Sequence, residues 1–175
     1  MTVIFIRHGK DKKSSHKYDE KLRKSAKKEA YRLAKELIGE HGMPDIIYYS
    51  PYVRTRQTLK YMHKFIKKHR KRNGIKEKPL LKVEPKLSRF FTSKERKNPD
   101  IRESTLNKGV IIVESKKEFK NRVSSHLEEV IDKAKQDKLK IWNITHGLVL
   151  VNVAEAKNIK LPKHLNYLER IVIES

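Results

Sequence analysis

The sequence contains no cysteine, which excludes disulfide bridges and thiolate metal sites. It also has no apolar run long enough to cross a bilayer. Its N-terminus enters a strand-like stretch at once and leaves no room for a charged and then apolar secretory signal. We therefore expect a cytoplasmic protein that makes no membrane contact.

Acidic residues are few: 21 Asp and Glu stand against 43 Lys and Arg, which gives a formal net charge of +22. Such a field attracts polyanions and speeds encounter with phosphorylated ligands, although a lysine-rich solvated surface explains it equally well. The densest basic run, residues 67–72, is interpreted as a solvated helix end, with polyanion docking as the alternative. Aromatic residues do not interleave with the basic runs, and no known nucleic-acid motif is present, so the sequence predicts at most weak, non-specific polyanion binding.

The order of the expected elements indicates the fold. Helical spacing of apolar residues predicts helices over residues 20–40, 52–72, 116–137 and 148–157. Short apolar runs predict strands over residues 3–6, 45–49, 80–84, 110–113, 139–144 and 168–174. Alternating strands and helices, with no repeat and no linker, favour a single α/β domain over residues 1–175. We expect a three-layer α/β/α sandwich with a mainly parallel sheet.

Polar signatures follow three of the expected strands. They are Arg-His-Gly at residues 7–9, Ser-Pro at 50–51 and Thr-His-Gly at 145–147. In parallel sheets, ligands bind beyond the carboxyl ends of the strands, so these stretches are expected to meet in one crevice. Residues 86–109 show no period and are interpreted as a lid or substrate loop.

This crevice would hold His8, His146 and Arg7, together with Arg54 from the first turn of the following helix. Two guanidinium groups can bind phosphoryl oxygens bidentately. A neutral imidazole is a competent nucleophile near pH 7, and a protonated second imidazole would stabilise the charge on a phosphate. The arrangement predicts phosphoryl transfer, which needs neither a metal nor a cofactor.

Three motifs lie in order along nearly the whole chain: Arg7-His8-Gly9, Ser50-Pro51-x-x-Arg54-x-x-Gln57-Thr58 and His146-Gly147. Together they resemble the histidine phosphatase superfamily, the phosphoglycerate mutase-like group (branch 1), in a compact form. The resemblance implies the phosphoglycerate mutase-like fold and no cofactor.

The resemblance also implies roles for individual residues. His8 would become phosphorylated, and Arg7, Arg54 and His146 would form the phosphate pocket around it. Gly9 would shape the turn after the strand. Residues 57–58, Gln and Thr, would anchor the helix rather than touch the substrate.

One position departs from the pattern of this family. Its members usually place a carboxylate just after the third strand, as general acid for the leaving oxygen. Here Ser88 and Arg89 occupy that stretch, and Glu84, Glu95 and Glu103 are the nearby carboxylates, so the acid is one of these three or is missing. The departure favours phosphoramidates, which have a better leaving group, over demanding phosphomonoesters.

The sequence thus predicts a phosphoric monoester hydrolase of the histidine acid phosphatase type. It would cleave phosphomonoesters or phosphoramidates, on a small molecule or a phosphoprotein, through a phosphohistidine on His8. The alternatives are a catalytically weak phosphate- or polyanion-binding module of the same fold and, with less support, a phosphoglycerate mutase. Trp142 is expected in the core. The remaining histidines are expected on the surface, and their spacing is not that of metal ligands: His16, His41, His63, His69, His126 and His164.

Overall fold

The computed structural model describes residues 1–12, 21–89, 114–162 and 165–174. In chain order, the elements are β1 (Thr2–Arg7), α1 (Lys24–His41), β2 (Ile46–Tyr49), α2 (Val53–Arg72), β3 (Leu80–Val83), the 3-10 helix η1 (Pro85–Leu87), α5 (Lys116–Gln136), β4 (Lys140–Thr145), α6 (Gly147–Ala156) and β5 (Arg170–Glu174). None of these helices is both long and apolar enough to cross a bilayer.

The strands of the described residues form one sheet in the order β3-β2-β4-β1-β5. β1, β2, β3 and β4 run parallel, whereas β5 pairs antiparallel with β1 at one edge. Right-handed crossovers of strand, helix and strand place helices on the faces of such a sheet. The mainly parallel α/β architecture that the element order predicted is therefore confirmed.

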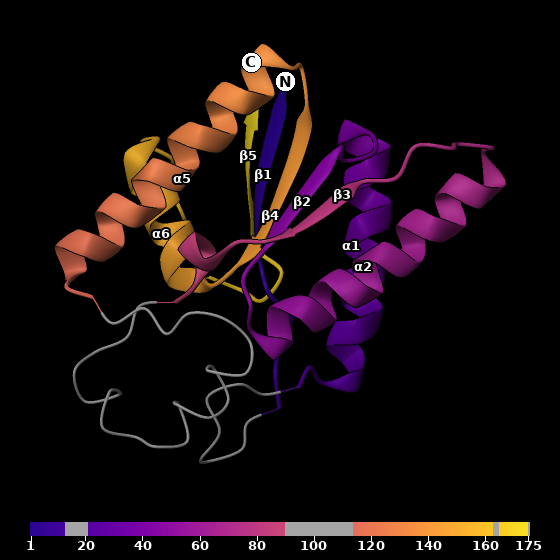
Figure 1. Cartoon of the computed structure of the whole chain (residues 1–175). Helices are drawn as coiled ribbons and strands as arrows, with labels where there is room; N and C mark the ends of the chain where they lie inside the picture. The colour runs from indigo at the N-terminus through magenta and orange to yellow at the C-terminus, as the bar shows by residue number, and fades with distance from the viewer. Residues whose placement is uncertain (13–20, 90–113, 163–164, 175) are drawn as a thin grey trace.

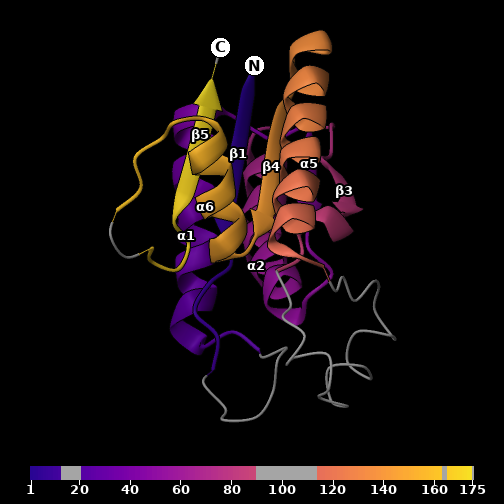
Figure 2. The ribbon, with the colours of Figure 1, turned by 90° about the vertical axis from the view of Figure 1, so that its left-hand side faces the viewer.

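Helices cover both faces of the sheet, as the two perpendicular views show (Figures 1 and 2). On one face, apolar residues of α1 and α2 pack with Ile4, Ile6 and Trp142 of the strands. On the other face, α5 and α6 pack against Val3 and Phe5. Because successive residues of a strand point to opposite faces, the unbroken apolar run of β1 supplies both layers. Trp142 is 1% exposed, as predicted for a core residue.

The first helix begins later than its spacing predicted, at Lys24 instead of residue 20. Leu22 is held outside the helix because its amide donates to Gln57 Oε1 at 2.8 Å and because it bridges to Asp11. At the other end, Gly42 has φ 79°, a left-handed value that suits glycine and stops the helix. The predicted strand 110–113 and most of the predicted loop 86–109 lie outside the described residues.

The prediction that His126 lies on the surface was wrong. Its side chain is 2% exposed, and Nε2 donates to Asn143 Oδ1 at 2.9 Å, while Nδ1 lies 3.9 Å from Glu84. Burial lowers the pKa of His126. The hydrogen bond to the side-chain amide of Asn143, on β4, compensates the burial of this polar ring. This partner could be identified only from the order of the strands in the sheet.

The other predicted surface histidines fall into two groups. His41, His63 and His69 are partly buried rather than fully exposed. His16 and His164 lie outside the described residues.

Candidate active site

The sheet brings together the three strand ends that carry the motifs. β1, β4 and β2 are neighbours, with Arg7 opposite Thr145 and Tyr49 opposite Ile144. The pairing continues past the strands, because the amide of His8 donates to Thr145 O at 2.9 Å and that of Ser50 to Ile144 O at 3.1 Å. The residues after β1, β2 and β4 therefore surround a single place at the carboxyl edge of the sheet.

His8 is held as a neutral imidazole with a defined tautomer. Its Nδ1 lies 2.8 Å from Gly9 O, and a carbonyl can only accept, so Nδ1 carries the proton and Nε2 keeps its lone pair. The side chain is 6% exposed. Burial, and then the positive charge of Arg54, lowers the pKa of His8 to about 3. An unprotonated Nε2 at neutral pH is the form that can act as a nucleophile.

His146 is the N-cap residue of α6, and its ring centroid lies 5.2 Å from that of His8. Nδ1 lies 3.4 Å from both Nε and Nη2 of Arg54, and Nε2 lies 3.0 Å from Ser50 Oγ. Because a guanidinium only donates, Nδ1 accepts and Nε2–H donates to Ser50. Burial, followed by the charge of Arg54, holds the pKa of His146 well below its usual value.

Two guanidinium groups complete the arrangement. Arg54, on the first turn of α2, is buried, and its Nη1 lies 3.9 Å from Asp11 Oδ2. Arg7 donates from Nη1 to Leu165 O at 2.6 Å and stacks on Tyr167, with Cζ 4.3 Å from the ring centroid. Its buried Nε has no hydrogen-bond partner among the described residues. An unsatisfied buried donor is costly, and an anion oxygen would satisfy it.

The loop after β1 is fixed from α2. The hydroxyl of Thr58 accepts from Gly9 N at 3.0 Å and donates to Arg54 O at 2.8 Å, so one side chain ties the loop to the arginine-bearing turn. A Cβ on Gly9 would lie 3.2 Å from Cβ of Ala26 on α1. Gly9 lets the loop approach α1 closely, and Gln57 and Thr58 accept hydrogen bonds from the amides of Leu22 and Gly9.

A model of the histidine phosphatase superfamily (branch 1) matches residues 3–166. The chain belongs to this superfamily. A comparison with curated protein sequences found no match.

Solved structures show the same fold at low sequence identity. An ecdysone phosphate phosphatase from Bombix mori, in complex with tungstate, has a TM-score of 0.72 at 15% identity, over 99% of this chain and 89% of the other. Phosphoglycerate mutase from Bacillus anthracis has a TM-score of 0.67 at 18% identity, over 99% of this chain and 88% of the mutase chain. The protein histidine phosphatase SixA, complexed with tungstate, has a TM-score of 0.54 at 20% identity, over 89% of this chain and 76% of the SixA chain.

The structure locates one of the three candidate acids of this histidine phosphatase superfamily member. Glu84 caps the 3-10 helix η1, because its Oε1 accepts a hydrogen bond from Lys86 N at 2.9 Å. Its other carboxylate oxygen lies 3.9 Å from Nδ1 of His126, on α5. Glu95 and Glu103 lie outside the described residues. The identity of the acid therefore stays a prediction.

Arg89, one of the two residues in the stretch where the resemblance leads us to expect a carboxylate, acts on both histidines. Its charge contributes to lowering the pKa of His8 and that of His146, after burial and Arg54. The preceding stretch is pinned to the end of β4, since Thr145 Oγ1 donates to Leu87 O at 2.7 Å. Ser88 is fully buried, and its Oγ has no hydrogen-bond partner among the described residues.

Three residues at the site were missed by the sequence reasoning. The ring of Tyr52 lies 4.9 Å from that of His146, Tyr167 lies 5.8 Å from His8, and Asp11 faces Arg54. Tyr52 sits inside the second motif, which could have indicated it. Nothing in the sequence around Tyr167 signals its position, because it reaches the site from the connection before β5.

No group of three His, Asp or Glu side chains that could hold a metal ion occurs within the described ranges. The side chains around His8 are instead those suited to an anion, with guanidinium and imidazole nitrogens. Hydrogen-bond donors and positive charge of this kind match the oxygens of a phosphoryl group.

Proposed function

We propose that this protein is a phosphatase that hydrolyses phosphomonoesters or phosphoramidates through a phosphohistidine on His8, without a metal or a cofactor. The observation that carries the proposal is the tautomer of His8. Gly9 O holds the proton on Nδ1, which leaves the Nε2 lone pair free, beside Arg54 and His146 in a buried cationic site. Such a nucleophile needs no separate base to activate it.

In the first step, Nε2 of His8 attacks the phosphorus atom. A P–N bond to the enzyme forms, and the bond from phosphorus to the leaving oxygen or nitrogen breaks; its electron pair goes to the leaving group, which takes up a proton from solvent. In the second step, water attacks the phosphohistidine, the P–N bond breaks, and its electron pair returns to Nε2. Both protons of the water leave on the product, dihydrogen phosphate. Arg7 and Arg54 would hold the phosphoryl oxygens throughout.

His146 would change its protonation state when substrate binds. Without an anion, burial and Arg54 keep its pKa low, but a phosphate dianion raises the pKa of an imidazole beside it. The imidazolium would then place positive charge on the phosphoryl oxygens. This is the charge stabilisation that phosphoryl transfer depends on.

The leaving group is proposed to be one that departs without strong acid assistance. Ser88 and Arg89 occupy the stretch where the family usually places a carboxylate, and neither a hydroxyl nor a guanidinium donates a proton readily at neutral pH. Phosphoramidates and aryl phosphates need less general acid catalysis than alkyl phosphates do. A small phosphorylated molecule and a phosphorylated protein side chain both fit this proposal, and we expect the protein to act in the cytoplasm as a single domain.

Hydrolysis of an aryl phosphate and of a phosphoramidate, measured with a chelator present, tests the proposal. We expect turnover in the wild type and a loss of about 10³-fold or more in His8→Asn. His63→Asn, on the outer side of α2, serves as the matched control and should retain activity. Undiminished turnover in His8→Asn would overturn the proposal.

The second candidate is a catalytically weak phosphate- or polyanion-binding module, which Arg89 and the net charge of +22 favour. It predicts that inorganic phosphate binds while no substrate of the panel turns over. A phosphoglycerate mutase is a third and less favoured possibility. It would require conversion of 3-phosphoglycerate with a bisphosphate donor.

A further inference from the structure

Among the described helices, α2 carries the highest density of positive charge. This helix carries nine Lys and Arg residues among its 20 and no Asp or Glu. The helix α5, of similar length, balances six basic residues with four acidic ones. Like charges spaced three or four residues apart destabilise a helix, so a solvated helix would ordinarily mix the two signs.

Among the described residues, the cations of α2 beyond its first turn form no ion pair with a carboxylate. Within the described ranges, the ion pair of α2 is that of Arg54 with Asp11, near the active site. Elsewhere on the surface, lysines form ion pairs with carboxylates, as Lys120 does with Glu155 and Lys133 with Asp137. A uniformly lysine-rich solvated surface would not show this difference between helices.

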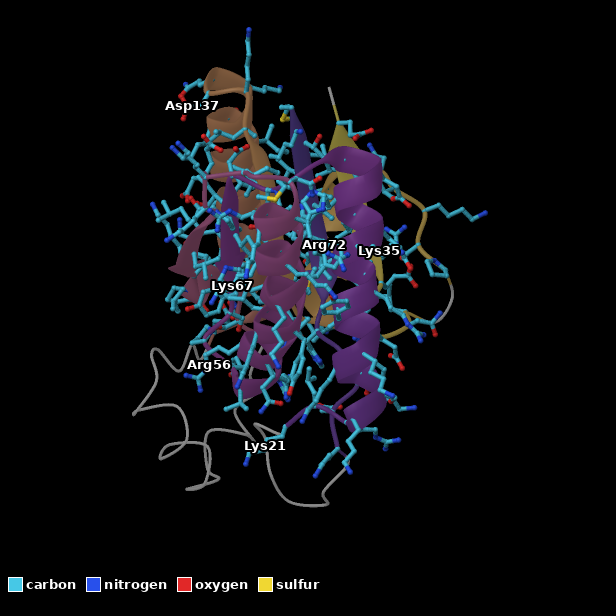
Figure 3. All side chains as sticks on the ribbon, turned by 90° about the vertical axis from the view of Figure 1, so that its right-hand side faces the viewer. Lys21, Lys35, Arg56, Lys67, Arg72 and Asp137 are labelled. Carbon is cyan, nitrogen blue, oxygen red and sulfur yellow. The ribbon has the colours of Figure 1, made fainter. Side chains whose placement is uncertain are left out.

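Six exposed cations form what we call the α2 basic surface: Lys60, Lys64, Lys67, Lys68, Lys71 and Arg72. Figure 3 looks onto this side of the molecule, with Lys67 and Arg72 of α2 labelled. The last turns of α2 reach out past the β3 edge of the sheet (Figure 1). A helix rises about 5.4 Å per turn, so these side chains form a row of cations along α2 from Lys60 to its last residue, Arg72.

Aromatic side chains lie among these cations, contrary to the expectation from the sequence. Lys64 Nζ lies 4.9 Å and Lys27 Nζ 5.5 Å from the ring centroid of Tyr61, and Phe65 packs edge-on against Tyr31 at 5.3 Å. The rings contact the lysines and one another. Contact with a ligand would therefore be made by the ammonium groups rather than by stacking on bases.

The shape of α2 argues against an anionic membrane as the partner. Its apolar residues Leu59, Met62 and Ile66 are buried against the sheet. The exposed large apolar side chains of the described residues lie elsewhere, on β3, on α6 and at Ile159. An amphipathic helix binds a bilayer by inserting an apolar face, and α2 has none to offer.

We propose that the α2 basic surface binds the phosphodiester backbone of nucleic acid without sequence preference. A row of closely spaced cations matches the regular phosphates of a strand, and release of counterions from the nucleic acid drives such binding. The surface begins at Lys60, more than one turn beyond Arg54, which lies on the first turn of α2, so binding does not depend on the catalytic proposal. Single strands and duplexes share this chemistry.

Fluorescence anisotropy with a labelled oligouridine, an oligothymidine and a DNA duplex tests the proposal over a range of salt concentrations. The test variant carries Lys64, Lys67, Lys68 and Lys71 replaced by Gln. The matched control carries Lys116, Lys117, Lys135 and Lys160 replaced by Gln, which removes the same charge from exposed positions off α2. Both variants should keep the far-ultraviolet circular dichroism spectrum of the wild type, which shows that they fold.

We expect the α2 variant to lose at least about tenfold in affinity, and the slope of log K against log salt to fall by about 3 for four lysines. The control variant should lose much less. Equal losses in both variants would assign the binding to net charge alone and overturn the proposal. Absence of binding at low salt, or binding to phosphatidylserine vesicles but not to nucleic acid, would also overturn it.

Discussion

At the scale of single residues, the site consists of two buried imidazoles whose protons are placed by their neighbours. Gly9 O fixes the proton of His8 on Nδ1, and the guanidinium of Arg54 leaves His146 with its proton on Nε2, toward Ser50. Both rings are neutral in a cationic surrounding. The site is therefore arranged for an anion that brings its own negative charge.

The low pKa of His8 makes stability depend on pH. The unfolded chain binds a proton at this histidine near pH 6.5, whereas the folded protein does so only near pH 3. The contribution of His8 is thus fully present above pH 6.5 and is lost as the pH falls toward 3. Between neutral pH and about pH 4.5, we expect His8 to account for about 2 to 3 kcal/mol of lost stability.

Urea unfolding of the wild type and of His8→Asn at several pH values measures this loss. As the pH is lowered from neutral to about 4.5, the unfolding free energy of the wild type should fall by about 2 to 3 kcal/mol more than that of His8→Asn. Parallel curves for the two proteins would contradict the burial of a neutral His8.

Ser50 tests the positioning of His146. Ser50→Ala removes the acceptor for Nε2–H, which leaves a buried donor unsatisfied. We expect kcat for an aryl phosphate to fall about tenfold with little change in KM, because the ring is less well oriented for the phosphoryl group. Ser125→Ala, which removes only a surface bond to Glu129, is the control and should leave kcat unchanged.

Sequence could predict the residues that motifs carry, and it missed those that only the fold brings close. His8 and His146 follow buried strands, so their common edge could be expected from the parallel sheet. His126 sits on the apolar stripe of α5 between Val123 and Val130, and this spacing should have indicated burial. Its partner Asn143 could not have been found without the strand order.

At the scale of elements, α2 connects the parts of the site. Its first turn carries Arg54, and one turn later Thr58 holds the loop of His8 through Gly9 N. Helical periodicity predicted this element well because its apolar face is regular. The start of α1 was predicted less well, since the hydrogen bond of Leu22 to Gln57 and its β-bridge to Asp11 are contacts that no local pattern shows.

Thr58→Val tests the connection between α2 and the loop. It leaves Gly9 N without its acceptor, so we expect a loss of about 1 to 3 kcal/mol in stability and a fall in kcat. Thr58→Ser keeps the hydroxyl and should restore most of kcat. An equal fall in kcat in Thr58→Val and Thr58→Ser, with unfolding curves that differ between the two variants, would show that the hydroxyl does not position the loop.

At the scale of the whole molecule, strand order decides what the motifs mean. β4 lies between β1 and β2, although it comes last of the three in the chain, and this order places residues 145–147 beside residues 7–9 and 50–54. Sequence could predict a parallel sheet but not this order, because the crossovers are long. Most of the predicted lid, residues 86–109, lies outside the described residues.

The net charge of +22 also predicts how the whole molecule responds to salt. Self-repulsion destabilises a compact chain of one sign, and salt screens it over distances of about 10 Å at 0.1 M. We expect the melting temperature to rise by about 3 °C between low and moderate sodium chloride. The variant with four Gln residues on α2 should show a smaller rise, and a melting temperature that falls with salt would contradict this view.

The most direct test is to trap the covalent intermediate with a labelled aryl phosphate and rapid denaturation in alkali. A phosphohistidine is stable in alkali and labile in acid, and peptide mapping locates it. We expect label on His8 of the wild type and none in His8→Asn, whereas His63→Asn should be labelled as the wild type is. Turnover without label on His8, or label that persists in His8→Asn, would contradict the proposed nucleophile.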